Sequence, residues 1–268
     1  MKFFTRLSLL VLVVSIVACG SDDDNGNTNN ANYFPLDEGA AWTYDNTAEL
    51  GDSRDSLYYV NDQQLNGNTY ANLDAEQPAN AFMTTILSEN LLRTSGSALI
   101  VNGDLGTVVL EGFPEINVPL DDVRLFDGDA SVGDELAIVT DEFTQDFMGF
   151  PFVVTFSVRS VQGETLPSYT AGGTPYDNVI ASQIIVNAQV VANIDLAGTT
   201  IEVPILVSQD VITATNYYAE DVGLIFSDVE LNYQLEDLSG VGIEFPFPTE
   251  ANQTSTQTLD TFVAVINN

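Results

Sequence analysis

The sequence predicts an all-β fold, in which a single antiparallel sheet is curved or rolled into an open barrel, with few or no helices. Apolar and polar residues alternate with a period of two in many segments, which is the pattern of strands with one buried face. Nineteen glycines divide the 268 residues, as a chain with many turns requires. Segments with helical periodicity are rare. A β-sandwich of two sheets is the alternative that the same observations allow.

The individual strands follow from this alternation. Phe152–Arg159 and Val229–Leu235 each place apolar residues on one face and polar residues on the other. Ile184–Ile194 and Ile201–Val211 repeat the pattern on either side of a short Asp195–Gly198 segment, which predicts a long hairpin. The β-branched segment Thr258–Ile266 predicts a late strand. We expect roughly ten to fourteen strands in total.

The segment Asn80–Arg93 is the main candidate for a helix. Phe82, Ile86 and Leu87 would share one side of it. The run Thr84–Ile86 favours extended backbone instead, so the pattern allows either a short helix or strands.

The first residues resemble an export signal. Lys2 and Arg6 precede an apolar run from Leu7 to Ala18, and this run is shorter than the roughly 20 apolar residues that a membrane-spanning helix needs. We therefore expect residues 1–18 to be a signal peptide that is removed.

Cys19 is the single cysteine of the chain and ends the sequence Ile16-Val17-Ala18-Cys19. This pattern resembles the lipobox of bacterial lipoproteins, in which the cysteine receives a diacylglycerol and, after cleavage, its new amine is acylated. Several acyl chains are expected because one chain alone holds a protein to a membrane only marginally. An ordinary secreted protein with a cysteine in its signal is the alternative.

Residues 19–32 read as a tether between the lipid and the body of the protein. The sequence Ser21-Asp22-Asp23-Asp24 directly follows Cys19 and Gly20. It resembles the surface-export tag of Bacteroidota lipoproteins, which implies the outer membrane and an orientation toward the exterior. The alternative is a solvated acidic tether that carries no export signal. The Asn-rich stretch that follows is typical of a flexible linker, and residues 33–268 are expected to form one β-rich domain.

The charge of the chain excludes several classes of partner. Six basic residues face 39 acidic ones, for a formal net charge of −33. Removal of the signal peptide would leave Arg54, Arg93, Arg124 and Arg159 as the basic side chains. Such a surface repels nucleic acids and anionic membranes, so the expected contact with a membrane is the lipid anchor alone.

Two motifs in the body resemble recurring segments of Bacteroidota lipoproteins of unknown function. The first is Tyr33-Phe34-Pro35-Leu36-Asp37-Glu38-Gly39-Ala40-Ala41-Trp42-Thr43-Tyr44, and the second is Tyr217-Tyr218-Ala219-Glu220-Asp221-Val222-Gly223-Leu224-Ile225-Phe226. The resemblance implies no activity. We expect Trp42 to be a core aromatic, with a ligand-stacking platform as the alternative. Strand alternation directs one of Tyr217 and Tyr218 inward and the other outward.

The residue inventory restricts catalysis. The chain has no histidine, its single lysine lies in the signal peptide, and Cys19 is expected to be lipidated. Catalytic triads, Schiff-base chemistry and zinc sites with histidine or cysteine ligands are therefore excluded. We expect no catalytic residues, no metal site and no cofactor. Calcium bound by the acidic clusters at Asp121-Asp122, Asp127–Asp129 and Asp134-Glu135 is the alternative.

The expected function is that of a non-enzymatic accessory or binding module of the cell envelope. A curved sheet would hold an apolar or glycan ligand in its concave face, although no ligand-binding residues can be named. One alternative is a structural or assembly partner of an outer-membrane protein complex. Another is a glycan-active enzyme that uses two carboxylates.

Overall fold

The computed structural model describes residues 31–49, 51–108, 116–147, 150–196, 199–238 and 248–264. These form twelve strands and one helix, α1 (Phe82–Glu89). The strands are β1 (Ala41–Ala48), β2 (Ser53–Leu65), β3 (Asn68–Ala75), β4 (Leu91–Ser95), β5 (Ala98–Val108), β6 (Ile116–Asp127), β7 (Glu135–Phe147), β8 (Phe150–Ala171), β9 (Thr174–Leu196), β10 (Thr199–Ala219), β11 (Gly223–Gln234) and β12 (Glu250–Val263).

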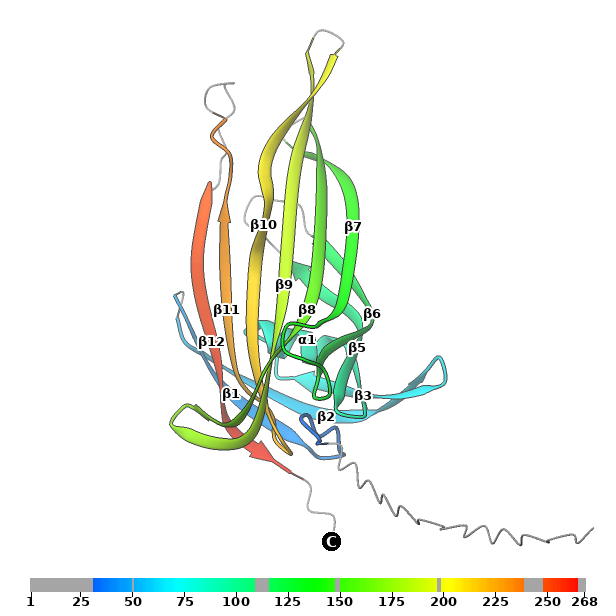
Figure 1. The fold of residues 1–268 in the computed structure, drawn as a ribbon, viewed down its shortest axis with the longest axis vertical. Coiled ribbons are helices and arrows are strands. Elements are labelled where there is room, and N and C mark those ends of the chain that lie inside the picture. The colour runs from blue at the N-terminus through cyan, green and yellow to red at the C-terminus, as the bar shows by residue number, and fades with distance from the viewer. Residues whose placement is uncertain are drawn as a thin grey trace, which may run out of the picture.

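All twelve strands belong to one antiparallel sheet, in the order β6-β5-β4-β3-β2-β1-β12-β11-β10-β9-β8-β7. The sheet curls until it is nearly closed into a barrel, with β6 and β7 as its two edges (Figure 1). The predicted all-β class and the single curved sheet are confirmed. The β-sandwich is wrong, because consecutive strands pair around one continuous sheet instead of dividing into two.

Side chains join the edge strand β6 to β8, which is not its ladder neighbour. The backbone N–H of Asp127 donates to Oε1 of Gln162 at 3.0 Å, and the Ser160 hydroxyl donates to the carbonyl oxygen of Arg124. The backbone of Gln162 also bonds the turn before β7, through Gly133 at 2.8 Å and Asp134 at 2.9 Å. Individual hydrogen bonds thus join the two edges of the sheet, and we call this junction the seam.

The longest strands are those that the sequence predicted most clearly. The expected hairpin of Ile184–Ile194 and Ile201–Val211 is confirmed by the pairing of β9 with β10. In β8, Phe152, Val154 and Phe156 face the core as the alternation required. The alternation in Ile201–Val211 was misleading, because β-bulges near Pro204, Leu206 and Asp210 shift the register. Val207 is exposed at 45% as a result. Ile201 is also exposed, at 42%, in the stretch Thr199–Glu202 at the start of β10, where every residue is exposed.

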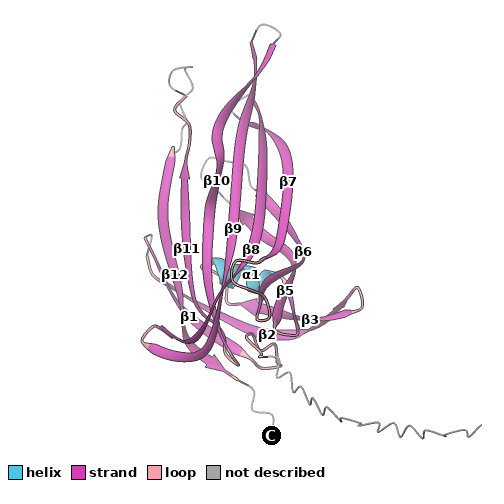
Figure 2. Cartoon of the chain, in the orientation of Figure 1, coloured by secondary structure: helices cyan, strands magenta, loops and turns pink. Residues whose placement is uncertain are grey.

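The segment Asn80–Arg93 contains both of the structures that its sequence allowed. Phe82–Glu89 forms α1, and Leu91 begins β4. Figure 2 shows the helix inside the curve of the sheet, where Thr84 of α1 accepts a hydrogen bond from Gln257 of β12. We call this concave side the inner face. Its core is apolar and extensive, and it includes Met83, Ile86 and Leu87 of the helix.

A carboxylate from a neighbouring strand caps the start of α1. Asp55 of β2 is 1% exposed and accepts from the backbone N–H groups of Asn80 at 3.0 Å and Ala81 at 2.9 Å. The Asn80 side chain adds a third bond at 2.9 Å. Burial alone would raise the pKa of Asp55, but these hydrogen bonds outweigh it and lower the pKa from its ordinary value.

Two strands near the end of the chain differ from their predictions mainly in length. Of the predicted strand Val229–Leu235, residues 229–234 lie in β11 and Leu235 directly follows it, with Tyr233 and Leu235 buried as predicted. The strand predicted at Thr258–Ile266 begins earlier, at Glu250, and is described to Val263. Residues 1–30, which include Cys19 and Ser21–Asp24, lie outside the described residues.

Candidate functional site

The end of the β8–β9 hairpin bends back across the outer face of the sheet. Figure 1 shows this tip crossing the neighbouring strands at the lower left. A Cβ at Gly172 would lie 2.8 Å from a methyl group of Thr258 in β12, so the tip touches a strand three places away in the sheet order. The bend follows a register shift between Gln162 and Thr165.

Gly163 permits the bend. A Cβ at this position would lie 2.8 to 2.9 Å from the side chain and backbone of Ala181. That is closer than a side chain tolerates, so only glycine lets the two strands approach here.

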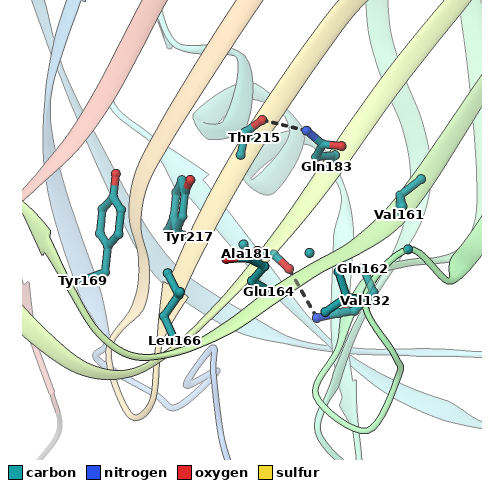
Figure 3. A pocket seen from close by; sticks show the side chains of 12 residues that line it. Val132, Val161, Gln162, Glu164, Leu166, Tyr169, Ala181, Gln183, Thr215 and Tyr217 are labelled. Atoms are coloured by element: carbon teal, nitrogen blue, oxygen red, sulfur yellow. Dashed lines mark hydrogen bonds between the residues drawn. The ribbon is translucent and has the colours of Figure 1, made fainter.

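An open groove lies where the hairpin leaves the sheet. Its volume is about 370 Å³, within the roughly 300–1,000 Å³ of ordinary ligand sites. Figure 3 shows its lining, and we call it the outer groove. It is lined by Val132, Gly133, Val161, Gln162, Gly163, Glu164, Leu166, Tyr169, Ala181, Gln183, Thr215 and Tyr217.

Two tyrosines from different strands form the aromatic wall of the outer groove. Tyr169 of β8 stacks on Tyr217 of β10, with ring centroids 4.2 Å apart and an interplanar angle of 14°. Phe226 of β11 packs against both rings at 6.1 Å. Burial raises the pKa of Tyr169, and Tyr217 and Asp228 add to the shift, so its hydroxyl stays neutral at physiological pH.

The remaining polar groups of the outer groove are mostly uncharged. Nε2 of Gln183 donates to the Thr215 hydroxyl at 3.1 Å, which leaves the amide oxygen facing the groove region (Figure 3). Glu164 is an exposed carboxylate at the rim. A stacked aromatic wall beside amide and hydroxyl groups can bind a flat or ring-shaped neutral molecule.

The aromatic residues singled out from the sequence differ in burial and in the face of the sheet on which they lie. Trp42 is 1% exposed, stacked between Phe34 and Phe262 at 5.1 and 5.4 Å. It is a core residue, and the ligand-stacking alternative is wrong. Tyr218 points inward and is fully buried, whereas Tyr217 is half-buried on the outer face, which confirms the predicted division. Tyr169 was missed, because only the bend of the hairpin brings it beside Tyr217.

The acidic clusters proposed as calcium ligands are engaged with protein groups. Asp122 accepts from Tyr70 and from Arg93 at 2.5 and 3.1 Å. Asp127 accepts from Arg124 at 2.8 Å and from the backbone of Asp129 at 3.1 Å. Across the described ranges, no three or more acidic, histidine or cysteine side chains gather as a metal site.

The inner face offers little for paired-carboxylate chemistry. Among the described residues, Asp55 is the carboxylate that is buried, and its oxygens are bound by Asn80 and Ala81.

The described part of the chain holds no helix with the length and apolar character to cross a bilayer.

Comparisons with known proteins give little to add to this geometry. No protein-family model matches the chain, and no curated protein matches it. Among solved structures, it is similar to a protein of Parabacteroides distasonis described as a candidate lipoprotein, with 11% sequence identity and a TM-score of 0.38. The match covers 87% of this chain and 99% of that one. A likeness this distant assigns neither a family nor an activity.

Proposed function

We propose that this protein is a lipid-anchored module at the outer-membrane surface that binds a neutral glycan in the outer groove and catalyses no reaction. The observation that carries the binding role is the stack of Tyr169 on Tyr217 along the wall of a 370 Å³ groove. Sugar rings present apolar C–H faces to aromatic rings and hydroxyl groups to amides, and the outer groove offers both kinds of contact.

The charge of the protein favours a neutral ligand. The chain carries a net charge of −33, and each of the four arginines in the described residues is already paired with an aspartate. The pairs are Arg54 with Asp45 and Asp260, Arg93 with Asp122, Arg124 with Asp127, and Arg159 with Asp210. Anionic glycans and phosphates would therefore meet repulsion that no nearby free cation offsets among these residues.

The location rests on the sequence of the first residues. The lipobox that ends at Cys19 and the acidic tag at Ser21–Asp24 support an anchor in the outer membrane with the body facing the exterior.

The charge of edge strand β7 argues against the alternative function, that of a structural or assembly partner of an outer-membrane protein complex. This strand carries Glu135, Asp141, Glu142 and Asp146, and charged edges resist pairing with a further strand.

Binding to a panel of neutral oligosaccharides tests the proposed function. Tyr217→Ala removes half of the aromatic stack, and we expect it to weaken binding roughly 2- to 13-fold, the range of a lost contact of about 0.5–1.5 kcal/mol. The matched control is Tyr58→Ala, since Tyr58 is a 37% exposed tyrosine on β2, outside the groove lining. Equal affinity of the two variants, or no binding by the wild type to any neutral oligosaccharide, would contradict the proposal.

A further inference from the structure

Six polar side chains form a continuous row across the inner face of the sheet. They lie on six neighbouring strands and are direct cross-strand partners: Asn46 pairs with Gln257, Gln257 with Ser227, Ser227 with Asn216, Asn216 with Ser182, and Ser182 with Gln162. Each is at most 7% exposed. We call this set the inner polar row. It interrupts a core that is otherwise apolar, which costs free energy unless the polar atoms are bonded.

The amide N–H groups of the row bond to protein atoms. Nδ2 of Asn46 donates to the Ser53 hydroxyl at 3.2 Å, and Nδ2 of Asn216 donates to the carbonyl oxygen of Ala214 at 3.3 Å. Nε2 of Gln257 donates to the Thr84 hydroxyl in α1. Each of these three amides thus has at least one of its two N–H donors bonded to the protein.

The matching acceptors have no protein partner in the described part of the chain. They are the side-chain amide oxygens of Asn46, Asn216 and Gln257, and beside them the hydroxyl groups of Tyr44 and Ser227 are also without a partner. The hydroxyl groups of Tyr218 and Ser182 lie within reach of each other and are left out of this set. Buried polar groups in folded proteins are nearly always bonded. Five such atoms on one face of the sheet therefore indicate a bound partner that is not part of the protein.

The chemistry of these atoms defines the partner. The three amide oxygens require hydrogen donors, and the hydroxyl groups of Tyr44 and Ser227 both donate and accept. A molecule with O–H groups also does both. A carboxylate or phosphate would instead place its oxygens against amide oxygens, beside the buried Asp55 and in a chain of charge −33.

A small chamber connects the row to solvent. It has a volume of about 50 Å³ and is lined by Asn46, Ser227 and Gln257 of the row together with Asn80–Phe82 at the start of α1. A second, more open groove of about 240 Å³ shares Ala48, Asn80, Val229 and Ser255 with the chamber. Since one water needs roughly 10–15 Å³, the chamber has room for a few waters or for one end of a small polyol.

We propose that the inner polar row is a binding site for O–H groups, reached through the chamber at the start of α1. Its ligands are small neutral molecules that carry such groups, either a polyol or ordered water. The chamber shares no lining residue with the outer groove, which meets the inner polar row only at its β8 end, at Gln162.

The sign of a stability change tests the proposal. Tyr44→Phe and Ser227→Ala each delete one hydroxyl group that has no protein partner, and circular dichroism checks that each variant keeps its fold. If O–H groups are bound, each deletion breaks a hydrogen bond, and we expect Tm to fall by about 2–4 °C. If the row is dry, deletion removes an unbonded polar atom, and an unchanged or higher Tm in both variants would overturn the proposal. Tyr58→Phe, on the exposed face of β2, is the control and should leave Tm unchanged.

Erythritol and trehalose then distinguish the two sources of O–H groups. Both compounds stabilise proteins generally by exclusion from the surface, but the disaccharide trehalose is too large for the chamber. A Tm rise with erythritol, a four-carbon polyol, that is greater for the wild type than for Ser227→Ala, with no such difference in trehalose, identifies a polyol site. Equal rises in the two compounds, together with the lowered Tm of the variants, identify ordered water.

Discussion

The backbone N–H of Asp127, at the end of edge strand β6, donates to the side-chain Oε1 of Gln162 in β8 at 3.0 Å. Gln162 is 2% exposed, and its Nε2 donates to the carbonyl oxygen of Ala181 in β9 at 3.3 Å. One side chain therefore joins three strands where the ladder of the sheet ends. Closure of the barrel at this point depends on a glutamine.

Gln162→Leu should therefore destabilise the protein. The substitution removes both side-chain bonds and leaves the Asp127 N–H without its acceptor, so we expect the free energy of unfolding to fall by about 2–4 kcal/mol. Hydrogen exchange at Asp127 should accelerate by more than the global change. Gln64→Leu, which alters an exposed glutamine bonded to Thr69, is the control. Exchange at Asp127 equal to that in the wild type would show that other contacts close the seam.

Gly223→Ala tests the contact between the two sequence motifs. The Trp42 indole N–H donates to the carbonyl oxygen of Val222 at 2.6 Å, and a Cβ at Gly223 would lie 2.9 Å from that indole nitrogen. Gly223 also has a φ of +105°. Strain and the clash together should cost about 2–4 kcal/mol in denaturant unfolding.

Gly173→Ala separates the two causes. Its φ of +85° imposes similar backbone strain, but no atom lies within 4 Å of the added Cβ. We expect roughly 1–2 kcal/mol of destabilisation from strain alone. A loss at Gly173 as large as that at Gly223 would mean that the indole contact contributes nothing.

The Asp55 carboxylate should make stability depend on pH. Its pKa is lowered in the folded state, so its contribution is present above the unfolded-state value near 3.9 and is lost as pH falls through the folded-state pKa. Asp55→Asn should reduce the free energy of unfolding by about 1.5–3 kcal/mol at pH 7. The difference from the wild type should shrink below about pH 4. A difference independent of pH would show that the charge of Asp55 does not stabilise α1.

Surface display is tested by protease treatment of intact cells. The prediction is that the wild-type protein is digested, whereas a variant with Ser21–Asp24 neutralised (Ser21→Ala and Asp22, Asp23 and Asp24→Asn) is protected. The control is neutralisation of three aspartates in the body, Asp141, Asp146 and Asp210, which should leave the protein accessible. Equal protection of the wild type and the tag variant would rule against the export role of Ser21–Asp24.

The sequence was most informative where one physical requirement dominates. In β8, burial of one face imposes a period of two, and Phe152, Val154 and Phe156 are buried as that period requires. The same reasoning failed in β10, where a bulge beside Pro204 shifts the period: Leu206 is buried at 1% and Val207 is exposed at 45%. Pro204 was the available signal, since a proline inside a strand pattern marks an edge or a bulge.

The candidate sites depend on contacts between residues that are far apart in the sequence, and neither the hydrophobic period nor the composition reveals such contacts. Tyr169 and Tyr217 are 48 positions apart and meet because β8 bends at Gly163. A glycine inside a strand pattern is a known sign of a bulge or close approach, so Gly163 was the available signal. In the sequence alone it cannot be told apart from the glycines of turns. The inner polar row is likewise invisible without register, because each of its members looks like an ordinary polar residue of a half-exposed strand.

The lipid anchor at Cys19 is the claim on which location and access to ligands both depend. The most direct test is intact and peptide mass spectrometry of the protein isolated from the membrane fraction. We expect an N-terminal peptide that begins at Cys19 and carries a diacylglyceryl group and an amide-linked acyl chain. A mature protein with an unmodified Cys19, recovered without detergent, would contradict the anchored module.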